Sequence, residues 1–97
     1  MIEHIVLMRL KDDASPEAIN RMLTELRALK GKVPDIVDLS CGTNFSDRAK
    51  GYTHGLVVRF KDRAGLEVYG PHVDHQRVVQ NFIKPIAVDV IAFDYEF

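Results

Sequence analysis

The sequence contains no tryptophan and a single cysteine, Cys41, among its 97 residues. One thiol cannot form an internal disulfide, and this cysteine usage is typical of a small domain in a reducing compartment. No basic residue neighbours Cys41, which lies in a strand-like run, so nothing beside it would activate it as a nucleophile. We therefore expect a buried structural thiol.

An excess of charge of either sign is also missing. Thirteen basic residues stand against fourteen acidic ones, which gives a net charge of −1. A nucleic-acid partner would need a basic face, and an anionic membrane would need a run of lysine and arginine. Because the chain has neither, we expect no nucleic-acid partner and no membrane partner.

Long hydrophobic runs are absent as well. No apolar run approaches the length that spans a bilayer. The first residues, Met1-Ile2-Glu3-His4, lack the basic leader and the small-residue cleavage site of a signal peptide. These absences predict a soluble, cytoplasmic protein.

The apolar content is sufficient for one hydrophobic core. Hydrophobic residues make up 46% of the chain, which is typical of a globular domain and not of a disordered one. The polar loop at residues 42–51 is too short to separate two domains. Residues 1–97 are therefore predicted to form a single domain.

Hydrophobic periodicity predicts four strands and two helical regions. Ser15-Pro16-Glu17 supplies a hydroxyl N-cap, a proline at the first helical position and an acid near the positive end of the helix dipole. The apolar stripe that follows ends at Gly31, which we expect to be the C-cap. Gly70-Pro71 breaks the second helical region, and Pro85 ends it. The predicted strands are 2–10, 35–42, 53–60 and 87–97.

This β-α-β-β-α-β order predicts an α+β fold. Short helical crossovers fold most simply into a four-stranded antiparallel sheet with both helices on one face. Right-handed crossovers place the first strand between the third and the fourth, in the centre. Asp35, Asp38 and Ser40 make the second strand the more polar one, which indicates an edge position.

The sheet face without helices is predicted to be apolar too. In either register, the first, third and fourth strands place several Val, Ile, Leu, Met or Phe side chains on it. Exposing such a face costs about 25 cal/mol per Å² of apolar area, and a patch of this kind usually marks an interface. We expect a homodimer that packs sheet against sheet. A monomer with a more polar open face is the alternative.

The stretch Tyr69-Gly70-Pro71-His72-Val73-Asp74-His75 carries the candidate chemistry. It holds two of the four histidines, preceded by a tyrosine, at the predicted helix break. A phenol and two imidazoles gathered there suit proton transfer. The alternative is that the histidines are solvated polar residues at a helix start and that Tyr69 is an ordinary core aromatic.

The chain resembles the stress-responsive dimeric α/β-barrel (Dabb) family. The resemblance rests on His4, Gly51-Tyr52-Thr53-His54, Tyr69 with His72 and His75, and Phe93-Asp94-Tyr95, and it covers essentially the whole chain. It implies a ferredoxin-like domain paired into a dimeric barrel. Most members of the family have no assigned activity. One relative, the plant olivetolic acid cyclase, performs an intramolecular aldol condensation without a cofactor.

The resemblance implies roles for several side chains. His75 matches the catalytic base of the cyclase and Tyr69 its hydrogen-bonding tyrosine, while His4 and His54 match two further pocket histidines. We add His72 to these two as a substrate-binding candidate. The chain departs from the family where Val73 replaces a frequent proline and Pro71 precedes His72 instead.

The two strand histidines are weaker candidates than His75. His4 and His54 each lie near the start of a strand, and the two strands are predicted to be antiparallel neighbours. Antiparallel pairing tends to put the two side chains at opposite ends of the sheet. A histidine at a strand start is also more often structural than functional.

Metal binding has less support than proton transfer. His72 and His75 are three residues apart, which on a helix would put them on one face, and Asp74 or His54 could supply a further ligand. The sequence contains no HExxH or CxxC pattern, and we expect no metal and no cofactor.

Three functional hypotheses remain open at this level. The first is a cofactor-free lyase or cyclase that binds a small apolar carbonyl compound between helices and sheet, with His75 as base and Tyr69 as donor. The second is a non-catalytic homodimer that binds an apolar metabolite or supports stress tolerance. The third is a small monooxygenase, which the absence of tryptophan and of a cofactor fingerprint disfavours. An open pocket shared by Tyr69 and His75 would favour the first, and a filled core the second.

Overall fold

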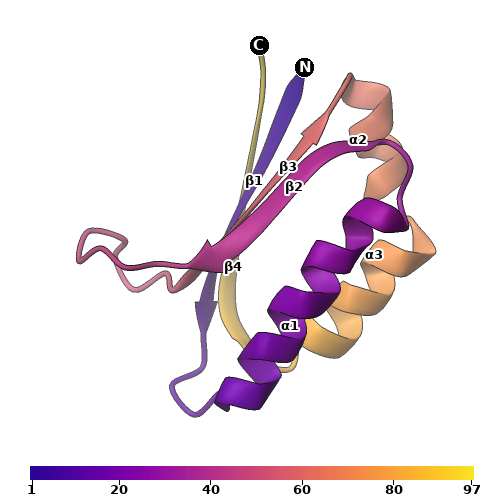
Figure 1. Ribbon diagram of the computed structural model, residues 1–97. Coiled ribbons are helices and arrows are strands. Elements are labelled where there is room, and N and C mark those ends of the chain that lie inside the picture. Colours follow the sequence, from indigo (N-terminus) through magenta and orange to yellow (C-terminus); the bar gives the residue numbers. More distant parts are fainter.

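A computed structural model describes all residues, 1–97, and it has the predicted order of elements (Figure 1). The fold is the expected ferredoxin-like α+β arrangement with a four-stranded antiparallel sheet. None of its helices combines the length and the hydropathy needed to cross a bilayer. The elements are β1 (Ile2–Leu10), α1 (Pro16–Ala28), a 3₁₀ turn η1 (Leu29–Gly31), β2 (Ile36–Thr43), β3 (His54–Phe60), α2 (Arg63–Tyr69), α3 (Val73–Val78), a π-helical turn η2 (Val79–Ile83) and β4 (Ala87–Glu96).

The sheet has the strand order β2-β3-β1-β4, so β1 lies between β3 and β4 as predicted. The second strand, β2, is at one edge, which confirms the expectation from its polar residues. The other edge is β4. Within β1, His4 lies opposite Val58 of β3 on one side and opposite Asp94 of β4 on the other.

The helix α1 follows its sequence signals closely at the N-terminus. The Ser15 hydroxyl accepts a hydrogen bond of 3.1 Å from the Ala18 amide, and Pro16 is the first helical residue. The prediction for Gly31 was wrong. The chain passes from α1 into the 3₁₀ turn, because fully buried Leu29 continues the apolar stripe beyond Ala28. Gly31 ends that turn without a positive φ and does not cap α1.

The second helical region is broken where the sequence predicts. Asp62 caps α2 by accepting a hydrogen bond from the Gly65 amide, and α2 ends at Tyr69, directly before Gly70-Pro71. A new helix, α3, begins at Val73 and continues into the π-helical turn. The helical segment ends at Ile83, and Pro85 lies in the turn to β4.

Alternation along the strands divides the sheet into two unlike faces. The face under the helices carries the hydrophobic core, in which Met8, Val58 and Phe60 are completely buried. On the opposite face, large apolar side chains of β1 and β4 are exposed in the single chain, with Phe93 at 61%. This open face, which we define by Leu7, Val57, Ile91, Phe93 and Tyr95, confirms the predicted apolar surface.

Candidate functional site

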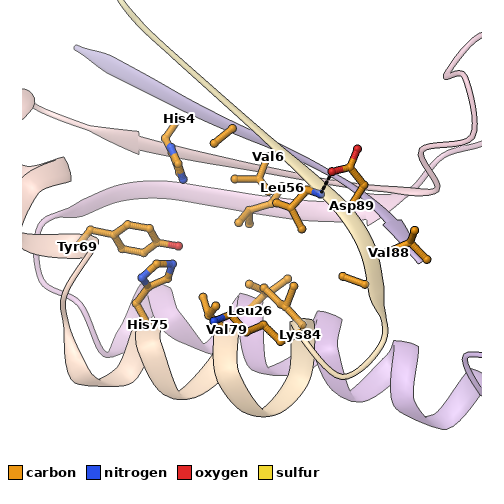
Figure 2. Close-up of a pocket in the computed structure, with 14 residues that line it drawn as sticks. His4, Val6, Leu26, Leu56, Tyr69, His75, Val79, Lys84, Val88 and Asp89 are labelled. Atoms are coloured by element: carbon orange, nitrogen blue, oxygen red, sulfur yellow. Dashed lines mark hydrogen bonds between the residues drawn. The ribbon is translucent and has the colours of Figure 1, made fainter. Parts of the chain in front are cut away.

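A cavity of about 480 Å³ lies between the sheet and the helices (Figure 2). Its volume is within the range of small-molecule pockets. His4, Tyr69 and His75 lie at one end, and Val88 and Asp89 lie at the other. Most of the wall between these ends is apolar and comes from several elements of the fold. The apolar lining residues are Val6, Leu26, Leu56, Tyr69, Val79, Ile83, Ala87, Val88, Val90 and Ala92.

The cavity exists because the helices cover only part of the sheet. α1 packs on β2, and α2 packs on β1 and β3, so β4 is left without close helical cover. Val88 and Val90 therefore remain 56% and 46% exposed although they line the cavity. The uncovered edge strand gives the cavity an opening to solvent, so the core at this point is not filled.

Tyr69 presents a hydroxyl that has no partner in the protein. Its side chain is 1% exposed, and the hydroxyl oxygen is buried without any hydrogen bond. The ring is held between Phe60 and His75, at centroid separations of 5.2 and 4.1 Å. Burial raises the pKa of Tyr69 above its usual value, so the group keeps its proton near neutral pH. It can therefore act as a hydrogen-bond donor but not as a base.

The helix break determines which nitrogen of the neutral His75 ring carries the proton. Pro71 has no backbone N–H and interrupts the helix, which leaves the Gly70 carbonyl free to accept hydrogen bonds from His75 Nδ1 at 2.8 Å and from Gln76 at 2.9 Å. A carbonyl oxygen can only accept, so Nδ1 carries the proton and Nε2 of the neutral ring has the free lone pair.

The charge state of His75 follows from its surroundings. Burial lowers its pKa, the Gly70 hydrogen bond partly opposes this, and His4 and His72 contribute a further lowering. The imidazole is therefore neutral near pH 7, with a lone pair on Nε2. A neutral imidazole next to a protonated phenol is a base beside a donor, which is the pair that proton abstraction from a carbonyl compound requires.

His4 completes this end of the cavity. Its ring meets Tyr69 edge-on at a centroid separation of 5.8 Å. His4 Nδ1 is hydrogen-bonded to the carboxylate of Asp94, the residue opposite it on β4. Because a carboxylate accepts, Nδ1 donates, and Nε2 is the nitrogen left for the cavity.

The other two histidines lie outside the cavity. In the β1–β3 pairing His54 lies opposite Met8, four residues along the strand from His4, as antiparallel pairing predicts. His54 is buried and hydrogen-bonded to Thr53, and burial lowers its pKa. His72 instead caps α3, since its Nδ1 accepts a hydrogen bond from the Asp74 amide. The structure thus brings together His4, Tyr69 and His75, and the substrate-binding roles of His54 and His72 stay predictions.

Three residues of the site were not identified from the sequence. Asp94 is part of the Phe93-Asp94-Tyr95 stretch on which the family resemblance rests, but its pairing with His4 depends on the β1–β4 register. Lys84 lines the cavity directly after the π-helical turn, and no sequence pattern indicates it. Asp89 lines the far end, with its carboxylate bound to the Tyr52 hydroxyl at 2.7 Å and to the Val90 amide at 3.0 Å.

Two further predictions from the sequence concern the Cys41 thiol and a metal site at His72 and His75. Cys41 is half-buried on β2, and its thiol donates to the Leu23 carbonyl at 3.7 Å. Burial raises its pKa, although Arg27 partly opposes this, so the thiol is not activated. His72 and His75 do not converge, because one caps a helix and the other faces the cavity.

Comparisons with known proteins bear on the whole chain. The family model described as Stress responsive A/B Barrel Domain matches residues 2–97. The chain is 35% identical, over 98% of its length, to a stress-response A/B barrel domain-containing protein of Arabidopsis thaliana. It spans only 36% of that protein, and less than half of the curated relatives it matches.

Solved structures share the fold. A dimeric ferredoxin-like protein of unknown function from Thermobifida fusca superposes with a TM-score of 0.87 at 25% identity, over 99% of this chain and 90% of that one. The hydroxynitrile lyase from Passiflora edulis gives a TM-score of 0.87 at 22% identity, over 97% of this chain and 90% of that one. The similarity to the hydroxynitrile lyase shows only that the two proteins share a fold.

Proposed function

The chain belongs to the stress-responsive A/B barrel domain family, and we propose that it binds a small apolar carbonyl compound in the cavity and acts on it as a lyase or cyclase without a cofactor. In this proposal His75 is the base and Tyr69 is the hydrogen-bond donor. The observation that carries it is the Tyr69 hydroxyl, which is buried at the cavity and lacks a partner. A buried polar group usually has a partner, so its natural complement is an oxygen acceptor on a ligand.

The proposed reaction begins with proton abstraction next to the carbonyl. His75 Nε2 takes a proton from the α-carbon, and the electrons of the broken C–H bond form the enolate. The enolate oxygen gains negative charge and accepts the hydrogen bond of the Tyr69 hydroxyl. The enolate carbon then attacks a second carbonyl of the same substrate, and protonated His75 returns its proton to the new alkoxide.

His4 and the apolar walls have supporting roles in the proposal. Because His4 Nδ1 donates to Asp94, His4 Nε2 can accept a hydrogen bond from a hydroxyl group of the substrate. The apolar walls exclude water and so strengthen the hydrogen bond from Tyr69. The hydroxynitrile lyase of similar fold supports only the point that this architecture can house a lyase.

A non-catalytic, ligand-binding dimer is the second candidate. Both candidates use the cavity, but only the first needs the Nε2 lone pair of His75. The open cavity that Tyr69 and His75 share supports the catalytic alternative. The third hypothesis, a small monooxygenase, stays a prediction.

We further propose that the working unit is a homodimer formed through the open face. The similar protein from Thermobifida fusca is dimeric. On this face Arg59 makes two hydrogen bonds to Glu3, at 3.1 and 2.8 Å, and its guanidinium lies over the Phe97 ring. The charges beside the apolar patch are therefore already paired, which suits burial against a second copy.

Exchange of the α-protons of acetophenone in deuterium oxide tests the proposed function. The wild-type protein should accelerate the exchange, as followed by proton NMR. His75→Gln should remove the acceleration, and Tyr69→Phe should reduce it by roughly a hundredfold. His54→Gln serves as the matched control, because His54 lies outside the cavity. Binding of acetophenone without any exchange would favour the non-catalytic candidate.

A further inference from the structure

Lys84 places an unpaired positive charge on the wall of the cavity. It follows the π-helical turn, where its amide donates to the Val79 carbonyl at 2.9 Å, and its side chain lines the cavity (Figure 2). The ammonium group forms no ion pair and no hydrogen bond within the chain. Lys30, by contrast, pairs with Asp38 at 3.3 Å. Lys84 is the only lysine or arginine among the lining residues.

Asp89, the only acid among the lining residues, forms no ion pair with Lys84. Both carboxylate oxygens of Asp89 are already bound, one to the Tyr52 hydroxyl and the other to the Val90 amide. Asp89 borders the cavity, but it lies opposite Arg9 in the sheet register, so its carboxylate is on the open-face side of the sheet. Lys11 adds a second positive charge nearby, since its ammonium donates to the Pro85 carbonyl at 3.1 Å.

The cavity therefore has two different polar regions joined by apolar walls. At one end, beside His4, His75 offers a base and Tyr69 offers a neutral hydrogen-bond donor. Lys84, an exposed residue, adds an ammonium group to the cavity wall. A ligand that satisfies both regions has a carbonyl oxygen, an apolar body and an anionic group.

We propose that the ligand of this cavity is a carbonyl compound that also carries a carboxylate, and that Lys84 binds the carboxylate while Tyr69 binds the carbonyl oxygen. This inference rests on the proposed function, because it places a second group of the same ligand. It narrows the ligand class from neutral carbonyl compounds to oxo-carboxylates.

Calorimetric titration with para-acetylbenzoate and its methyl ester tests the inference. The two probes share the ketone and the aromatic body and differ in the negative charge. The wild-type protein should bind the acid about fivefold more tightly than the ester. This ratio is at the upper end of what an exposed ion pair contributes to binding. The preference should weaken as salt is raised, because salt screens exposed charges.

Variants of Lys84 assign the preference to this side chain. Lys84→Met should abolish the preference for the acid and leave the affinity for the ester unchanged, whereas Lys84→Arg should retain it. Lys61→Met is the matched control, since Lys61 is exposed outside the cavity. Equal affinities for the two probes, or a preference that persists in Lys84→Met, would overturn the inference and leave the proposed function intact. If neither probe binds, the proposed function fails as well.

Discussion

The rings of Tyr69 and His75 lie 4.1 Å apart between centroids, on opposite sides of the Gly70-Pro71 break. Their closeness depends on that break, because α2 ends at Tyr69 and the freed Gly70 carbonyl holds His75 by its Nδ1. One backbone feature thus brings a donor and a base together and fixes which nitrogen of the base is free. The same burial that keeps Tyr69 protonated keeps His75 neutral.

Tyr69→Phe should separate stability from function. The Tyr69 hydroxyl has no partner, so its removal breaks no hydrogen bond in the folded protein. The free energy of unfolding should stay the same or rise by about 1 kcal/mol. Urea denaturation measures this change, with the same variant losing most of the proton-exchange activity. A clear loss of stability in Tyr69→Phe would mean that the hydroxyl has a structural partner.

The pH dependence of α-proton exchange should report the titration of His75. Burial lowers the pKa of His75, so its Nε2 remains unprotonated at a lower pH than in a free histidine. The exchange rate should rise with pH and level off, with a midpoint below about 6.5. Rate profiles of the wild-type protein and of His54→Gln should coincide. A midpoint above the free-histidine value would contradict the assignment of His75 as the buried base.

Stability should fall as the solution is acidified through the histidine range. His54 and His75 both have lowered pKa values in the folded protein because they are buried. The unfolded chain then binds protons more tightly than the folded chain, so protonation favours unfolding below about pH 6.5. The free energy of unfolding should be smaller at about pH 5.5 than at about pH 7.5.

Histidine variants test whether His54 and His75 cause this pH dependence of the free energy of unfolding. Replacement of His54 and His75 together by glutamine should flatten the dependence between these two pH values. Replacement of exposed Asp47 by asparagine, which touches neither histidine, should leave it unchanged. A slope that is the same in the double variant would assign the effect to other groups.

The open face should hold two copies together. Sedimentation at micromolar concentration should give a species of twice the 11.0 kDa chain mass. Phe93→Glu places a charge on the exposed apolar patch and should yield monomers, because an unpaired carboxylate resists burial. Val68→Glu, at an exposed valine on α2, should remain dimeric. A wild-type protein that sediments as a single chain would refute the proposed dimer.

Local signals were sufficient to predict most of the fold. The Ser15 cap, the Gly70-Pro71 break and the alternation of the strands each act through neighbours in sequence, and each appears in the structure. The C-cap at Gly31 was wrong because the burial of Leu29, a tertiary effect, extends the helical segment. Propensity competes with packing, and here packing decides the end of α1.

The site could be predicted only in part. Tyr69 and His75 are close in sequence, so the helix break alone indicates that they can meet. The bond of Asp94 to His4 depends on the register of two strands that are about ninety residues apart in the chain. The position of Lys84 depends on the π-helical turn before it, because the wider turn changes the direction in which the next side chain points.

The most direct test of the account is the ¹³C NMR shift of acetophenone labelled at its carbonyl carbon, bound to the wild-type protein and to Tyr69→Phe. A hydrogen bond from Tyr69 to the carbonyl oxygen should move the resonance downfield on binding to the wild-type protein, and the movement should be largely lost in Tyr69→Phe, while His54→Gln behaves as wild type. An equal shift in the wild-type protein and in Tyr69→Phe would contradict the claim that this buried hydroxyl receives the carbonyl oxygen of the ligand.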